Sequence, residues 1–450
     1  MKRQTLFTQT LMLTGANFIV RIIGFGMRIW LSRTLGAEAL GVMELAGSAH
    51  MLWLAPVTSG LPMAISRFTA QAVAAGDELR RRQVLLAGKR LARRISWVMF
   101  FAMLVASPWI ARLLGDSRTL PTLLAYLPCL PILALSAVYN GYCYGSDNTV
   151  APAASEMIEQ LLRFAVCFAV FAMLPPMRVS YAAAVPAVGV LIGEGVGLVI
   201  VMIMLRRSQP ERGLALPDGL MKKIWRLAFP MTCMRMSNTL MRAVNAALIP
   251  MRLRASGLGA AESTARLGMY NGMAMSLIMM PAVFTGALAM VSAPAITKRE
   301  SDPAAMRRLI RRTIIPAAGV SLLSMAVMWF AAPFFANKLY RQAELEPLLR
   351  ALCPCVLLMG VQQVISGLLA GLGQQRRALY ASLTGGVITA ALSYWLAGVP
   401  SLRLNGVAIA AQIGLAITLL MNVRYLALAV TRAENRRDEG QNSTQKKGIA

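Results

Sequence analysis

Four arginines fall inside stretches that are long and apolar enough to cross a lipid bilayer. They are Arg21 and Arg28 in 8–31, and Arg235 and Arg242 in 224–251. The members of each pair are seven residues apart, so on a helix both project from nearly the same face. An arginine at the bilayer centre costs roughly 3 kcal/mol, and two such pairs at matched positions predict a charged cavity built from two similar halves. For Arg28, near the outer end of its stretch, a simple extension to the headgroups is the alternative.

A second set of ionisable residues lies in the predicted helices of the first half. It consists of Glu156, Glu159 and Arg163 in 153–174, and Glu194 in 181–205. Carboxylates inside a membrane are candidates for coupling or gating, but Glu159 and Arg163 are four residues apart and equally fit a structural ion pair. Glu194 is the better candidate for a proton or sodium site, or for pairing with an arginine. After Lys223 we expect every acid to lie in a loop or in the tail.

The composition predicts the kind of elements that position these residues. The chain is 57% hydrophobic and only 14% charged, which a water-soluble protein of 450 residues does not tolerate. We therefore expect an all-α polytopic membrane protein with about twelve transmembrane helices. The predicted spans are 8–31, 40–66, 95–114, 120–144, 153–174, 181–205, 224–251, 267–296, 314–335, 348–372, 379–396 and 407–428.

The distribution of positive charge predicts the orientation. The net charge of +27 comes from short runs of cations between the predicted spans, mainly at 80–94, 206–226 and 298–312. These runs fall on one side of the membrane, so we expect a protein of the cell (cytoplasmic) membrane with both termini in the cytoplasm. The same pattern predicts contacts with membrane lipids and argues against nucleic acid as a partner.

A direct repeat relates the two halves of the chain. Basic residues at 90–94 correspond to 308–312, and Gly141 and Gly145 correspond to Gly367 and Gly371. Six helices of the same orientation in each half predict two parallel lobes that bind substrate between them. The glycine pairs predict close helix contacts within a monomer. The predicted parts are an N-terminal lobe at 1–205, a cytoplasmic linker at 206–223, a C-terminal lobe at 224–430 and a disordered cytoplasmic tail at 431–450.

Several motifs resemble those of a known family. They are Gly-Leu-Pro-Met-Ala-Ile-Ser-Arg at 60–67, the segment 152–163, Gly193-Glu194, and 281–296 with its two prolines. Over essentially its whole length the chain resembles stage V sporulation protein B and its polysaccharide-exporter relatives. These belong to the multidrug/oligosaccharidyl-lipid/polysaccharide exporter superfamily, whose MurJ-like members are lipid II flippases. Many relatives have fourteen helices, and this chain stops at twelve.

The resemblance implies a MATE/MurJ-like fold whose central cavity is lined by the first helix of each lobe. It implies that Arg21, Arg28, Arg235 and Arg242 meet a lipid-linked pyrophosphate. We group Arg67, which ends the motif at 60–67, with these substrate-binding residues.

Three functions account for these features. The first is a flippase for an undecaprenyl-linked cell-wall or polysaccharide precursor, and the cationic helices favour such an anionic, lipid-linked substrate. The second is a cation-coupled multidrug exporter of the same superfamily. The third is a non-transporting scaffold for wall-synthesis proteins, against which the charged cavity argues.

Enzymatic chemistry is not predicted. The chain contains no Walker A sequence, and neither a Ser/His/Asp nor a Cys/His set can be assembled, so we expect no catalytic residues. The six cysteines and the single histidine, His50, lack the spacing of a metal site. We expect no cofactor, and coupling to H⁺, Na⁺ or the membrane potential would drive transport.

Overall fold

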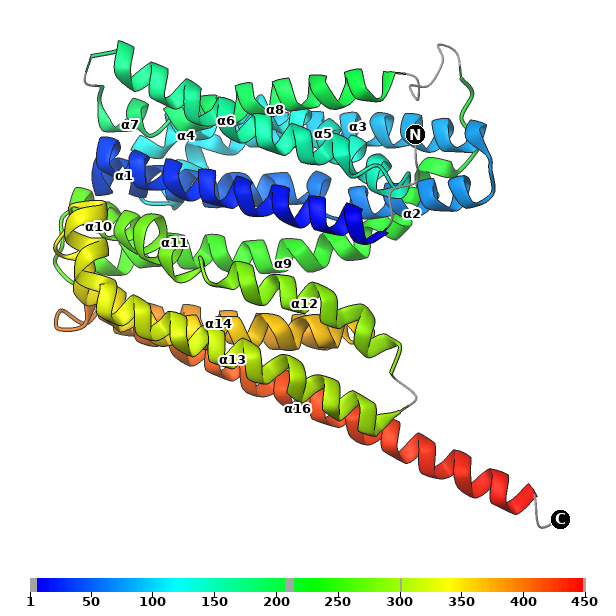
Figure 1. The fold of residues 1–450 in the computed structure, drawn as a ribbon. Helices are drawn as coiled ribbons and strands as arrows, with labels where there is room; N and C mark the ends of the chain where they lie inside the picture. Colours follow the sequence, from blue (N-terminus) through cyan, green and yellow to red (C-terminus); the bar gives the residue numbers. More distant parts are fainter. Residues whose placement is uncertain (1–5, 176, 207–213, 300–301, 448–450) are drawn as a thin grey trace. The chain divides into compact units, whose positions relative to one another are not determined.

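The computed structural model describes residues 6–175, 177–206, 214–299 and 302–447. In these ranges every regular element is a helix and there is no strand, which confirms the predicted all-α class (Figure 1). The chain forms two compact units. The first comprises Met1–Met251 and Gly259–Gly272, and the second comprises Arg252–Leu258 and Met273–Ala450.

The helices follow one another with short connections. Those that begin in the first unit are α1 (Leu6–Thr58), α2 (Gly60–Ala74), α3 (Glu78–Leu113), the 3₁₀ turn η1 (Ser117–Thr119), α4 (Leu120–Tyr126), α5 (Cys129–Gly145), α6 (Val150–Met173), α7 (Val179–Ala182), α8 (Val185–Met204), α9 (Leu220–Ala255), α10 (Ala260–Leu267) and the π-helix η3 (Gly268–Ala274). Those of the second unit are α11 (Met275–Ile278), α12 (Ala282–Thr297), α13 (Pro303–Pro333), the π-helix η4 (Phe334–Tyr340), α14 (Leu345–Gly371), α15 (Gln375–Leu396) and α16 (Arg403–Lys447).

The helices identify a multi-pass membrane protein. Among the described residues, seven helices are long and apolar enough to cross a membrane, or nine if each of two bent pairs is one span. Every predicted span lies mostly on helix, although 120–144 and 267–296 are each bent at a break between two helices. The span in α6 carries three charges, and the span in α9 is too polar to qualify. The qualifying stretch Phe18–Ala74 has 57 residues, more than twice what one crossing needs. The count of twelve therefore stays a prediction.

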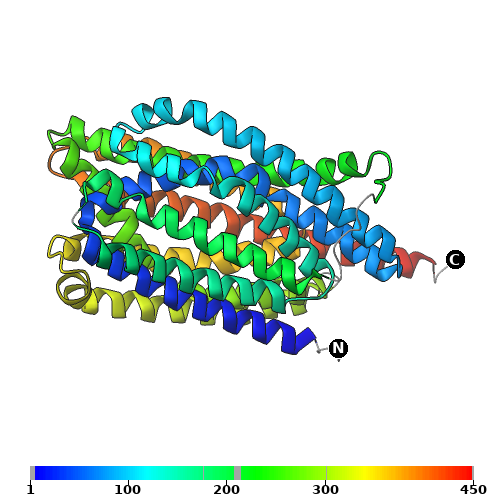
Figure 2. The ribbon, with the colours of Figure 1, turned by 90° about the horizontal axis from the view of Figure 1, so that it is seen from above.

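A reversal inside α1 determines which residues of this helix can meet. Gly36 has φ 75° and ψ 173°, a backbone conformation that is essentially restricted to glycine. Figure 1 and Figure 2 show the blue chain running away from the N-terminus along α1 and then returning toward α2. Residues on the returning segment consequently lie beside the first segment, although a continuous helix would carry them far away.

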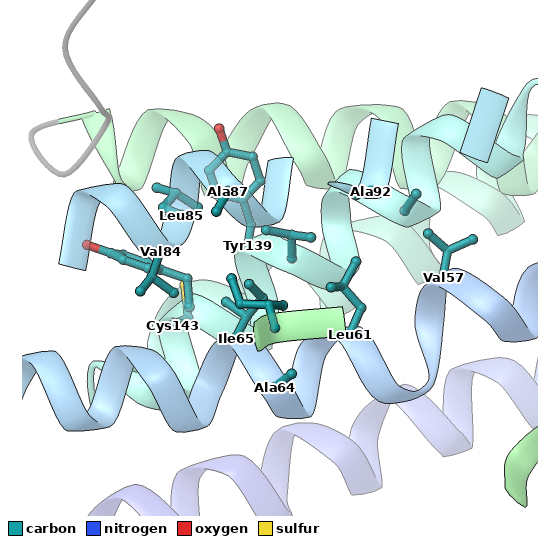
Figure 3. Close-up of a cluster of buried hydrophobic side chains, with 14 of the residues drawn as sticks. Val57, Leu61, Ala64, Ile65, Val84, Leu85, Ala87, Ala92, Tyr139 and Cys143 are labelled. Atoms are coloured by element: carbon teal, nitrogen blue, oxygen red, sulfur yellow. The ribbon is translucent and has the colours of Figure 1, made fainter. Parts of the chain in front are cut away.

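The core of the first unit forms where α2, α3 and α5 meet. Leu61 and Ile65 of α2, Leu85 of α3 and Tyr139 of α5 are each at most 1% exposed and gather in one apolar cluster (Figure 3). The cluster also includes buried residues at the start of α9, such as Ile224. This packing fixes the first turns of α9 against the helices of the first half of the chain.

Two glycine pairs allow close helix contacts, as the sequence predicted. A methyl group at Gly141 or Gly145 of α5 would lie 2.9 or 2.7 Å from atoms of α2. A methyl group at Gly367 or Gly371 of α14 would lie 2.8 or 2.7 Å from atoms of α12. These distances are too short for a real methyl group, so the prediction of packing within the bundle is confirmed. The same contact recurs in each unit, as a repeat requires.

The structure differs from the predicted organisation at two places. The first unit includes α10 and α9 up to Met251, whereas the sequence assigned both to the C-terminal lobe. The lobe and linker boundaries stay a prediction, and 207–213 of the linker lie outside the described residues. The structure shows α16 as helix to Lys447, where the sequence predicted a disordered tail. Nine of the 17 residues in 431–447 are Arg, Glu, Gln or Lys, which have favourable helix propensity, and this run continues directly from the preceding span.

Candidate functional site

Four of the five predicted substrate-binding arginines are exposed. They are Arg21 on α1, Arg67 on α2, and Arg235 and Arg242 on α9. Among the described residues, the guanidinium groups of these four arginines make no hydrogen bond and no ion pair. These groups are therefore available to an anion that is not part of the protein.

Arg28 differs from the other four because it is paired. Its Nη2 lies 2.6 Å from Oε1 of Glu44, and its Nη1 donates to the carbonyl oxygen of Asn271 at 3.5 Å. Glu44 belongs to the returning segment of α1, so the reversal at Gly36 creates this ion pair. The sequence offered Glu44 only as a nearby acid, because the two residues are 16 positions apart. An anion that binds Arg28 has to compete with this carboxylate.

The predicted coupling residues meet where α6 packs along α8. Arg163 Nη2 lies 3.5 Å from Oε1 of Glu194, so Arg163 pairs across helices with an acid of α8. Glu159 is 8% exposed and accepts a hydrogen bond from the hydroxyl of Ser155. Glu156 on the same helix is half-buried. The sequence allowed an ion pair between Glu159 and Arg163, and the structure shows a different partner for each.

Three glycines of α8 make this arrangement sterically feasible. Gly189, Gly193 and Gly197 recur every fourth residue on the side of α8 that faces α6. A methyl group on Gly193 would lie 2.8 Å from the carbonyl oxygen of Glu159, and one on Gly197 would lie 2.5 Å from its Cγ. The glycine stripe thus leaves the space that the buried Glu159 side chain fills. This stripe was readable in the sequence as two overlapping Gly-x-x-x-Gly motifs and was missed.

The arginine face of α1 lies against the same helix α6. Gly24 is on the same side of α1 as Arg21 and Arg28, three residues after the first and four before the second. A methyl group on Gly24 would lie 2.6 Å from Nε2 of Gln160, the neighbour of Glu159. The first unit therefore brings two predicted arginines and the predicted coupling acids onto adjoining helices.

A polar network that sequence analysis did not identify connects three segments. Asp116, whose side chain is 5% exposed, accepts hydrogen bonds from the Arg118 guanidinium at 2.8 Å and from the Thr264 hydroxyl at 2.9 Å. Arg118 also pairs with Glu38, just after the reversal in α1. Burial raises the pKa of Asp116, but the hydrogen bonds from Arg118 and Thr264 lower it more, so its pKa lies below the usual value. The network ties α10 to α1 and to the connection after α3.

The single histidine lies in the interior of the first unit. His50 is 2% exposed and stacks on Tyr126, with ring centroids 4.3 Å apart and an angle of 12° between the rings. Within the described ranges, no group of three or more His, Cys, Asp or Glu residues could hold a metal ion. The observed contact of His50 is thus aromatic packing.

Comparisons with known families and proteins agree with this architecture. The profile of the family described as polysaccharide biosynthesis protein matches residues 6–300, and the MatE profile matches residues 236–395. Stage V sporulation protein B of Bacillus subtilis (strain 168) is 27% identical over 437 residues, which cover 94% of this chain and 83% of that protein. Lipid II flippase MurJ of the same organism is 23% identical over 446 residues, covering 91% and 80%.

Solved structures share the fold. An inward-facing multidrug resistance MATE family transporter of the MOP superfamily matches with a TM-score of 0.74 and 18% identity, covering 93% of this chain and 99% of that one. An outward-facing transporter of the same description matches with a TM-score of 0.67 and 16% identity, covering 96% and 98%. The likeness to transporters of this architecture therefore extends over nearly the whole chain.

Proposed function

Because the chain belongs to the polysaccharide biosynthesis protein family, we propose that it is a flippase for an undecaprenyl-linked cell-wall or polysaccharide precursor. It moves this anionic lipid from the inner to the outer leaflet by alternating access. One relative that matches over most of its length is named for the flipping of lipid II, which supports this substrate class.

The observation that carries the proposal is the set of exposed arginines without a described partner on α1 and α9. Arg21, Arg235 and Arg242 lie in predicted spans, where each costs roughly 3 kcal/mol to insert. A phosphate offers charge-assisted hydrogen bonds that offset this cost, and the fork of an arginine suits two phosphate oxygens. A neutral or cationic substrate would leave the cost uncompensated.

Arg28 takes a different part in this proposal. Its ion pair with Glu44 keeps it neutralised while no substrate is bound. A pyrophosphate that reaches α1 through Arg21 would attract Arg28 away from Glu44, because it offers more negative charge than one carboxylate. Because of this ion pair, Arg28 binds only a ligand with more negative charge than the single carboxylate of Glu44.

The acids on α6 and α8 supply the coupling step in this proposal. Arg163 and Glu194 form a loose ion pair at 3.5 Å, which protonation of Glu194 or binding of Na⁺ would break. Release of Arg163 beside the buried Glu159 would change the packing of α6 on α8. Coupling to H⁺, Na⁺ or the membrane potential can thereby act on the helix that adjoins the arginines of α1.

A second function, a cation-coupled multidrug exporter, is favoured by the match of residues 236–395 to the MatE profile and by the same acids. The two functions differ in the charge of the substrate. An exporter of cationic drugs would depend on Glu159 and Glu194 for binding and would gain from neutral residues at Arg21 and Arg235. A scaffold for wall-synthesis proteins would depend on none of the four.

We place the protein in the cytoplasmic membrane as a monomer with both termini inside, acting as a transporter and not as an enzyme. Reporters fused after Gly76 and after Gly219 should then report the cytoplasm, and one after Gly259 should report the outside. If the reporters after Gly219 and Gly259 agreed with each other, α9 would not cross the membrane and the twelve-span arrangement would be refuted.

The decisive experiment is rescue of bacterial cells depleted of their lipid II flippase, together with flipping of a fluorescent lipid II in vesicles. The wild type should support growth and flipping, and the Arg21→Gln, Arg235→Gln double variant should support neither at equal membrane abundance. Arg226→Gln, an exposed position nine residues earlier on α9, is the matched control and should behave as wild type. Failure of the wild type in both assays, with efflux of cationic drugs instead, would replace the flippase by the exporter.

A further inference from the structure

An apolar groove of about 420 Å³ lies between α1, α3 and α9 of the first unit. Its volume falls within the range of roughly 300–1,000 Å³ that is typical of ligand sites. The main walls are Ile95, Val98 and Met99 of α3 and Trp225, Phe229 and Met236 of α9. Val98 and Phe229 are 61% and 51% exposed, so the groove opens to the surroundings of the helices.

The length of the groove matches one leaflet of a bilayer. From Trp225 to Met236 the helix rises about 16 Å, which is half of the roughly 30 Å hydrocarbon core. Lys222 and Lys223 stand just before Trp225 at the start of α9, and tryptophan is typical of the level of the headgroups. The groove therefore begins at the headgroups and reaches the middle of the membrane.

The polar groups of the groove are arranged for an amphiphile with a negative head. The hydroxyl of Thr232 accepts a hydrogen bond from the backbone N–H of Gly60 at 3.3 Å, so its oxygen is occupied by α2. Arg94, at the end of the groove where α3 enters the membrane, is exposed and makes no ion pair among the described residues. An apolar wall with a cation at its mouth is complementary to a single hydrocarbon chain that carries a phosphate.

The position of the groove on α9 relates it to the substrate arginines. Arg235 and Arg242 share one face of α9, and the groove residues Trp225, Phe229 and Met236 share another about 110° away around the helix. Met236 directly follows Arg235. A lipid whose chain lies in the groove therefore has the arginine face of the same helix next to it.

We propose that this groove holds the polyprenyl chain of the phosphorylated lipid carrier, with Arg94 at its phosphate before the head moves to the arginine face of α9. The inference rests on the proposed flippase function and adds a binding site for the apolar part of its substrate. A single long chain fits one groove, whereas a phospholipid would leave its second chain outside.

Cys233, which lines the groove, provides a direct probe of occupancy. It is exposed, whereas the other five cysteines of the chain are buried. The purified protein in phosphatidylcholine vesicles is treated with a membrane-soluble maleimide, and the rate of labelling is followed as undecaprenyl phosphate is added. We expect undecaprenyl phosphate to protect Cys233 and an equal mole fraction of phosphatidylglycerol to leave it reactive. The Cys233→Ser variant defines the background.

The mouth of the groove is tested by charge removal. Arg94→Gln should weaken protection by undecaprenyl phosphate about fivefold, the effect of one cation at a membrane surface. Arg93→Gln is the matched control, since Arg93 is also exposed but does not line the groove. Protection by uncharged undecaprenol should be the same in both variants and in the wild type.

A larger side chain on the α3 wall of the groove tests whether the lipid chain lies there. Val98→Trp should abolish cross-linking of a photoreactive undecaprenyl phosphate to α9, whereas Val105→Trp should not. Val105 is a matched control because it is also a valine of α3, is 63% exposed and lies two turns further along the same face, outside the groove. Each variant is first checked for an unchanged elution profile.

Equal protection by phosphatidylglycerol, or no protection by undecaprenyl phosphate, would overturn the proposal. Flipping that persists in Val98→Trp at the wild-type rate would also overturn it while leaving the flippase function intact. Protection of Cys233 without any flipping by the wild type would refute the flippase function and leave a lipid site that the transporter does not use.

Discussion

The close contact between Gly197 and Glu159 predicts that replacing this glycine by alanine destabilises the protein, although the same substitution elsewhere in a helix is stabilising. In Gly197→Ala, the new methyl group would lie 2.5 Å from Cγ and 2.6 Å from Cδ of Glu159. The Glu159 side chain must then move, and its hydrogen bond with Ser155 is lost. In Gly195→Ala, two residues earlier on α8, the nearest atom to the methyl group is 4.0 Å away. This variant serves as the control.

Both substitutions gain the stabilisation that alanine gives a helix, but only Gly197→Ala also introduces a steric clash. Replacing a glycine inside a helix by alanine stabilises it by about 0.5–1 kcal/mol, and this applies to both. Overpacking costs about 1–3 kcal/mol and applies only at Gly197. We therefore expect Gly195→Ala to raise the free energy of unfolding by about 0.5–1 kcal/mol. The free energy of unfolding of Gly197→Ala should be about 1–3 kcal/mol lower than that of Gly195→Ala.

The assay is thermal unfolding of the purified protein in lipid nanodiscs, followed by tryptophan fluorescence. The double variant Gly197→Ala, Glu159→Ala tests the assignment of the clash, because removing the carboxylate makes room for the methyl group. The loss of free energy of unfolding in the double variant should be smaller than the sum of the losses in the two single variants. If Gly197→Ala is as stable as Gly195→Ala, or if the double variant shows no coupling, α8 does not pack on Glu159 as described.

Three further predictions concern the charged residues of the first unit. Glu44→Gln removes the carboxylate that lies 2.6 Å from Arg28 and should lower the free energy of unfolding by about 1–3 kcal/mol, discounted for partial exposure. The Arg28→Gln, Glu44→Gln double variant should recover most of this loss, and a double variant as unstable as the single one would argue against the pair. Because the pKa of Asp116 is lower in the folded protein than its usual value of about 3.9, the stability that Asp116 contributes is present above that pH and is lost as the pH falls below it. Asp116→Asn should therefore be less stable than the wild type at neutral pH and lose less stability on acidification, measured by melting temperature; parallel pH curves would contradict this. Glu194→Gln should flatten the dependence of transport on pH or membrane potential in proteoliposomes, whereas Glu262→Gln, an exposed acid of α10, should not, and an unchanged response would leave Glu194 as a structural partner of Arg163.

The amino-acid sequence by itself determined the class of the protein and much of its internal order. The class follows from local composition and spacing: long apolar stretches, cations gathered mainly in short runs between them, and the repeated Gly141/Gly145 and Gly367/Gly371 pairs. A helix satisfies all of its backbone hydrogen bonds within one segment, so a long apolar stretch predicts a helix in the bilayer. The arginines of α1 and α9 were identifiable for the same reason, since a charge stands out in an apolar stretch. Helix contacts at the glycine pairs were predicted and confirmed.

Only the tertiary structure decided which charged residues meet. Arg28 pairs with Glu44 because the chain reverses at Gly36, and Arg163 pairs with Glu194 because glycines bring α8 close to α6. Asp116 and Thr264 are 148 residues apart and share no pattern in the sequence. Ion pairing depends on distances of a few ångströms between different helices, whereas periodicity describes only the direction of a side chain from its own helix. The choice of partners therefore had to come from the packing.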